Sequence, residues 1–150
     1  IVNSAYSSTI YTLDDAGNVV IGGGLNATTS TVLGKISERI TMSSAGTGSV
    51  TFDTTNNSIF YNNGPTANIT ANFTNVSTTA DRATSVTVIL SQSATARIVN
   101  AVQINSTSST INWANGVVPT GNANKHDIFG FSLIRSGSTW VTLGQMSTYG

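Results

Sequence analysis

The run closest to a catalytic arrangement is Lys125-His126-Asp127, which contains the single histidine of the chain. A serine hydrolase would use His126 as general base, Asp127 to orient it and one of the serines as nucleophile. No serine stands in a nucleophile-elbow motif, and neighbouring residues of a strand point to opposite faces of a sheet. We therefore expect His126 to have a structural or surface role, and we predict no catalytic residue.

Metal binding has equally little support in the residue types. The chain has no cysteine, and one histidine leaves only scattered carboxylates as further ligands. The run Asp14-Asp15-Ala16-Gly17-Asn18 begins like a calcium loop, but the later oxygen ligands and the terminal glutamate are missing. A β-turn is the favoured interpretation, and we predict no metal site and no cofactor within one chain. An ion on the axis of an oligomer stays open.

Polysaccharide cleavage would need two carboxylates about 5 to 10 Å apart. After residue 40 the acidic residues are Asp53, Asp81 and Asp127, and the first two lie in turn-like segments. This distribution argues against a glycosidase, so we expect the chain not to be an enzyme.

Glycan binding is the remaining chemistry that the residue types allow. Sites of this kind combine an aromatic face with a few placed amide or hydroxyl groups. Two short runs offer that combination, and the candidate contacts for a host glycan or protein are Tyr61, Asn62, Asn63, Trp113 and Asn115. For Trp113 the alternative is burial in the core or between chains, where aromatic side chains bury most area.

The composition limits the partners of the chain. Charged residues make up 8 % and sum to a net charge of zero, whereas Ser, Thr and Asn account for 60 of 150 residues. Without a basic patch, binding to nucleic acid or to an anionic membrane surface is not expected. No apolar run approaches the roughly 20 residues of a membrane span. The absence of charge repulsion favours association between copies.

The elements that must position these residues are strands. From residue 48 onward, Thr- and Val-rich runs with a period of two alternate with Gly, Asn and Asp turns. They predict strands over 49–52, 58–61, 69–74, 85–90, 96–104, 110–113, 128–134 and 139–143. The nearly continuous apolar run at 85–90 predicts a central strand. Together they predict an all-β domain, an antiparallel β-sandwich of jelly-roll-like form over residues 41–150.

The first forty residues have a different pattern. Residues 13–25 combine a turn, a short strand, the triple glycine Gly22-Gly23-Gly24 and a second short strand. Strands this short cannot bury their apolar side chains within one chain, whereas copies wrapped about a common axis could bury them together. We predict a Gly-rich β connector over residues 1–40, intertwined in a trimer and leading into the head. Residues 31–40 also fit a helix, although a strand around Ile36, Ile40 and Met42 is preferred.

Several segments resemble structural proteins of tailed bacteriophages, in particular those of marine and cyanobacterial phages. The resemblance of the connector lies in Asp14 to Asn18 followed by 19–25. In the head it lies in 69–76, 82–88, 111–113 with 119–121, and 131–145. The resemblance implies a trimeric β appendage on the virion, either a tail fibre, a head fibre or a capsid decoration.

The leading hypothesis is therefore a virion structural protein, the distal domain of a homotrimeric fibre or similar appendage on the particle surface. Its expected partners are its own copies, other virion proteins on the N-terminal side, and a host-surface glycan or protein. The alternative is a glycan-binding receptor-recognition or adhesin module. A surface protein of non-viral origin has the same low charge and abundant hydroxyl groups, and this origin also stays open.

Overall fold

A computed structural model describes residues 11–13, 19–21, 38–44 and 46–150. The chain divides into two compact units, Ile1–Ile36 and Ser37–Gly150. In the first unit, β1 (Tyr11–Leu13) and β2 (Val19–Ile21) pair antiparallel, with Thr12 opposite Val20. The predicted turn at 14–18 and the triple glycine lie outside the described residues.

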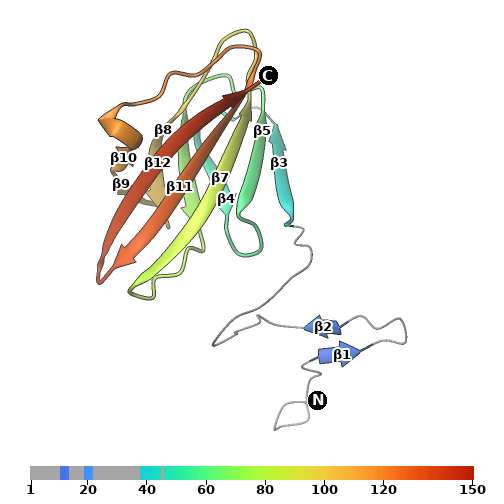
Figure 1. The fold of residues 1–150 in the computed structure, drawn as a ribbon, viewed down its shortest axis with the longest axis vertical. Coiled ribbons are helices and arrows are strands. Elements are labelled where there is room, and N and C mark those ends of the chain that lie inside the picture. Colours follow the sequence, from blue (N-terminus) through green and yellow to red (C-terminus); the bar gives the residue numbers. More distant parts are fainter. Residues whose placement is uncertain (1–10, 14–18, 22–37, 45) are drawn as a thin grey trace. The chain divides into compact units, whose positions relative to one another are not determined.

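The second unit is a sandwich of two β-sheets (Figure 1). The larger sheet has six strands in the order β10-β12-β11-β7-β5-β3. The bounds of these strands are Ile111–Trp113 (β10), Thr139–Tyr149 (β12), His126–Ser136 (β11), Arg82–Ser91 (β7), Ile59–Asn63 (β5) and Ile40–Ser44 (β3). β7 lies inside this sheet, as its apolar sequence predicts.

The smaller sheet has four strands in the order β4-β6-β8-β9. Their bounds are Gly48–Asp53 (β4), Ile69–Thr74 (β6), Val99–Ile104 (β8) and Thr107–Ser109 (β9). A one-residue irregularity between Ile69 and Thr70 shifts the register of β6 against β8. A 3₁₀ turn, η1 (Ala114–Gly116), follows β10.

The all-β class and the sandwich are confirmed, but the sheets are mixed rather than antiparallel. From β3 to β8 the chain changes sheet after every strand, so neighbours within one sheet run in the same direction. These six strands form three stacked coils, β3–β4, β5–β6 and β7–β8. The antiparallel part consists of β7, β11 and β12 in one sheet, and of β8 and β9 in the other. The predicted jelly-roll topology is therefore wrong for this chain.

Aromatic side chains fill the space between the sheets. The ring of Phe52 lies 5.0 Å from that of Phe60 and 5.8 Å from that of Phe73, centroid to centroid. Phe73 in turn lies 5.8 Å from Phe131 of the larger sheet. Each buried phenylalanine contributes about 1.5–3 kcal/mol, so this row across the sandwich is a main source of its stability.

Candidate interaction surface

The outer face of the six-stranded sheet is the surface that departs most from an ordinary solvated sheet. Along each long strand, buried residues alternate with residues that point away from the core. Many of these outward residues are large and apolar. We call this surface the apolar face, and its large members are Ile40, Met42, Ile59, Tyr61, Ile89, Ile128, Ile134, Val141, Leu143 and Tyr149.

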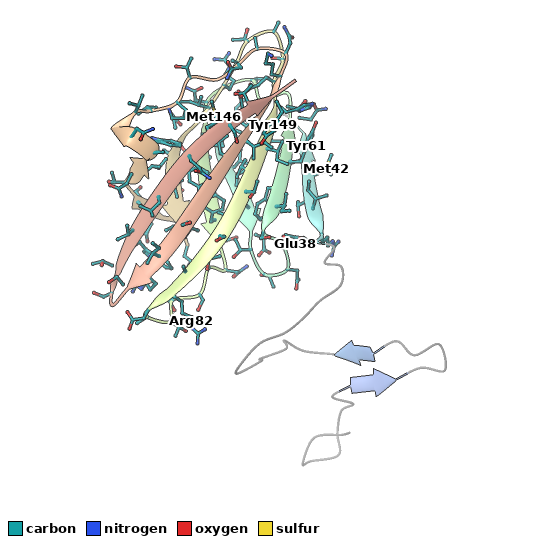
Figure 2. All side chains as sticks on the ribbon, viewed as in Figure 1. Glu38, Met42, Tyr61, Arg82, Met146 and Tyr149 are labelled. Carbon is teal, nitrogen blue, oxygen red and sulfur yellow. The ribbon has the colours of Figure 1, made fainter. Side chains whose placement is uncertain are left out.

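The rows of the apolar face follow from the strand register. Met42 lies opposite Tyr61, Tyr61 opposite Ile89, and Ile89 opposite Ile128, so one row crosses four strands. Figure 2 shows Met42 and Tyr61 side by side on β3 and β5. The exposed fraction of Met42 is 64 %, so most of this apolar side chain lies in solvent.

The outer face of the smaller sheet provides an internal comparison. Most of its outward positions carry polar side chains, and in one row Thr51 pairs with Asn72 and Asn72 with Gln103. That face has the polar character expected of a sheet surface in water. Because both faces belong to one small domain, the apolar character of the larger sheet is a local feature of that sheet.

Charge is absent from the apolar face. No Asp, Glu, Lys or Arg occupies an outward position on β3, β5, β7, β11 or β12. Charged groups lie instead around its edge. In Figure 2, Glu38 precedes β3 and Arg82 begins β7 at one end of the sheet, and Tyr149 lies near the other end. The guanidinium of Arg135 stacks over the Trp140 ring at 5.0 Å.

A hollow of about 570 Å³ crosses the sheet from β7 to β10. We place it on the outer face, because no residue of the smaller sheet lines it. Its floor is a register row whose side chains turn inward, and its walls are the two neighbouring outward rows, which contain small residues such as Ser85, Ser132 and Gly130 together with Leu143 and Gln145. The hollow makes the apolar face concave at this place, and none of the side chains that line it is charged.

Two of the predicted contact residues lie on the apolar face, next to residues that the sequence interpretation did not include. Tyr61 is half-buried, and its ring centroid lies 6.3 Å from that of His126. Asn63 is exposed at the end of β5. Tyr149 lies opposite His126 on the neighbouring strand. The long β11–β12 hairpin brings the last residues of the chain to this place, which the local patterns of single strands do not reveal.

The structure does not bring the other three predicted contacts to this place. Asn62 is fully buried and points into the sandwich, where its amide nitrogen donates to the Ser43 hydroxyl at 3.2 Å. A fully buried side chain cannot contact a partner, so including Asn62 was wrong. Trp113 is partly buried: it packs edge-on against Phe129 at 6.3 Å and also lines the hollow of the apolar face, so the burial considered for it as an alternative is only partial. Asn115 is exposed in η1, beyond the opposite edge strand.

His126 and Asp127 face opposite sides of β11, as predicted. His126 is exposed, whereas Asp127 is fully buried. The Asp127 carboxylate accepts hydrogen bonds from Gln92 Nε2 (2.8 Å), the Asn122 backbone N–H (2.8 Å), Asn122 Nδ2 (3.2 Å) and Thr148 Oγ1 (2.7 Å). Burial alone would raise the pKa of Asp127, but these hydrogen bonds outweigh it and lower that pKa. The carboxylate therefore ties two loops to the last strand.

The other acidic side chains are also bound to their own surroundings or fully in solvent. Hydrogen bonds from Asn75 and Thr55 lower the pKa of Asp53 from 3.8 to about 2. Asp81 is exposed in a left-handed turn. Within the residues that the structure describes, no group of three or more His, Cys, Asp or Glu side chains could hold a metal ion. No helix of the described part is long and apolar enough to cross a membrane.

Comparison of the chain with family models, with curated proteins and with solved structures found no match.

Proposed function

We propose that this chain is a structural protein of a tailed-bacteriophage virion, the outer domain of a trimeric fibre-like appendage. The observation that carries the proposal is the stack of three coils, β3–β4, β5–β6 and β7–β8. In such a stack each coil pairs with the coil next to it, so the structure extends along one direction. Extended, repetitive β-structure of this kind suits a protein that has to project from a particle.

The edges of the stack support the same proposal. β3 and β4 form the first coil, and both are edge strands of their sheets within the described residues. An edge strand leaves backbone N–H and C=O groups free to pair with another chain, unless the edge is covered or charged. The low charge and the abundant hydroxyl groups give β3 and β4 little such protection. Assembly with other copies would provide it.

On this proposal the function lies in shape and in the number of copies. An assembly that presents three copies of a weak binding surface binds a host surface with higher avidity than one copy does, although each copy makes the same contacts. The chain would then act on the virion surface as a non-enzymatic component. Other virion proteins would hold it through its N-terminal side.

The test is the mass of the full 150-residue chain in solution, measured by sedimentation velocity and native mass spectrometry. We expect three times the 15.5 kDa of one chain. Antibodies raised against the chain should also label intact particles of the phage that encodes it. A stable monomer at tens of micromolar would overturn the trimer, and unlabelled particles would overturn the place on the virion.

A second candidate, a glycan-binding module, is favoured by one group on the apolar face. Tyr61, Asn63, His126 and Tyr149 place three aromatic rings and an exposed amide around one end of the sheet. Such a group could stack on an uncharged sugar and hydrogen-bond to its hydroxyls. Binding to host glycans on an array should be lost in Tyr61→Ala and kept in Asn115→Ala. Silence of the unaltered chain across host glycans would exclude this candidate.

A further inference from the structure

We infer that the apolar face is the surface through which copies of this chain associate, with the apolar faces of the three copies turned toward one another around a common axis. This inference rests on the proposed assembly of copies and adds to it the surface that the copies use. It also predicts which face of the sandwich stays in solvent, namely the polar outer face of β4, β6 and β8.

The chemistry of the face is the first argument. An interface that forms after folding is distinguished less by its total apolar area than by the depletion of charge at its centre and by enriched aromatic and Met side chains. The apolar face meets each condition. It contains Met42, Tyr61 and Tyr149, its outward positions lack charged side chains, and charges such as Glu38 and Arg82 lie at its edge.

The size of the face is the second argument. Its five longest strands contain 42 residues in total. At a rise of about 3.3 Å per residue and a strand spacing of about 4.8 Å, they cover roughly 670 Å². A stable interface of standard size buries about 800 Å² on each partner, and a corrugated face exposes more area than its flat projection. One face thus provides about the area that one chain buries in a stable assembly.

The absence of charge also indicates the occupant. A partner recognised through opposite charge would require charged groups on this face, and the face has none. A second copy brings a surface of equal area that is equally free of charge, and the net charge of zero causes no repulsion between copies. Identical chains usually assemble with closed symmetry, and in a closed ring of three each apolar face can contact the faces of both other copies.

The experiment places one charge on each of two distant strands of the face. Met42→Glu lies on β3 and Leu143→Glu on β12, and both side chains are exposed in one chain, 64 % and 45 %. The matched control is Gln103→Glu, at an outward position of β8, a strand inside the smaller sheet. For each full-length variant, sedimentation velocity gives the mass, and far-ultraviolet circular dichroism with thermal unfolding gives the fold.

The expected result is a trimer for the unaltered chain and for Gln103→Glu, and a folded monomer for Met42→Glu and Leu143→Glu. If the unaltered chain is a trimer and both face variants stay trimers, the inference is overturned while the proposed assembly stands. If the unaltered chain is a monomer, both fail. If the unaltered chain is itself a monomer and the melting temperature falls only in the two face variants, another part of the same chain covers the face, which also overturns the inference.

Discussion

Replacing Asp127 by asparagine should lower the free energy of unfolding more than any other change of one acid to its amide in the head. Asp127 is fully buried and accepts four hydrogen bonds from three residues. Asparagine keeps the size of the side chain, but it removes the negative charge and turns one oxygen into a donor. The substitution therefore tests the hydrogen-bond network with little change in packing.

The magnitude follows from how the new amide can orient. Its NH₂ group would replace Oδ1, because the Thr148 hydroxyl can turn round and accept, whereas the Asn122 backbone N–H can only donate. Asn122 Nδ2 loses one acceptor but keeps Thr148 Oγ1 at 2.8 Å. The remaining hydrogen bonds are no longer charge-assisted. A hydrogen bond to a charged group contributes about 1.5–3 kcal/mol, whereas one between neutral groups contributes about 0.5–1.5 kcal/mol. We expect a loss of about 2–4 kcal/mol at pH 7.

The loss should depend on pH. Because the native pKa of Asp127 is lowered, the ionised carboxylate stabilises the native state at pH values above the unfolded pKa of about 3.9. This stabilisation disappears as the pH falls through the native pKa, below that value. The difference between the unaltered chain and Asp127→Asn should therefore be constant from about pH 5 to 8 and shrink below pH 4.

Urea unfolding followed by Trp fluorescence at a series of pH values measures this difference. The matched control is Asp81→Asn, because Asp81 is exposed and its φ of 58° is one that asparagine tolerates. The control should unfold within about 0.5 kcal/mol of the unaltered chain. An Asp127→Asn variant as stable as this control at pH 7, or a difference independent of pH, would refute the role assigned to the carboxylate.

Three further changes test the packing of the head by the same unfolding assay. Gly144→Ala should lower the free energy of unfolding by about 1–3 kcal/mol, because the new Cβ would lie 2.7 Å from Ile111 and 3.0 Å from the Trp113 ring. Its control, Gly130→Ala, has a nearest contact of 3.6 Å and should leave the free energy of unfolding unchanged. Trp113→Ala should cost about 2–4 kcal/mol by opening the side of the core, and wild-type stability in this variant would contradict that packing. Asn105 has a φ of 48° and exchanges two hydrogen bonds with the Val76 backbone, so Asn105→Ala should lower the free energy of unfolding by about 2–3 kcal/mol. Asn105→Gly should lower it by about 1 kcal/mol less, because glycine accepts that backbone angle. Equal losses in the two variants would contradict a backbone contribution.

The strands of the head could be predicted because a half-buried sheet imposes a period of two on the sequence. The predicted runs at 69–74 and 85–90 coincide with, or lie within, the observed strands β6 and β7. Strand direction could not be predicted in this way, because side chains alternate equally in parallel and antiparallel sheets. The direction depends on whether the chain crosses to the other sheet after each strand, which is a property of the connections.

The candidate surface was predictable only in part. Tyr61 and Asn62 are neighbours on one strand, so their side chains must point to opposite faces. With Phe60 in the core, Asn62 belongs to the buried side, and this signal was present in the sequence. The meeting of Tyr61 with His126 and Tyr149 depends instead on strand register across β5, β7, β11 and β12, which no local pattern contains.

The coil arrangement has a consequence for how such a protein can change in length. Corresponding residues of the first two coils are 19 apart in the larger sheet and 21 apart in the smaller one. Duplication of a segment of about 20 residues would therefore add one strand to each sheet and leave the β11–β12 hairpin in its place. A shorter insertion would have to remain in a loop, since it cannot supply both strands. Related chains of this fold should accordingly differ in length by whole coils.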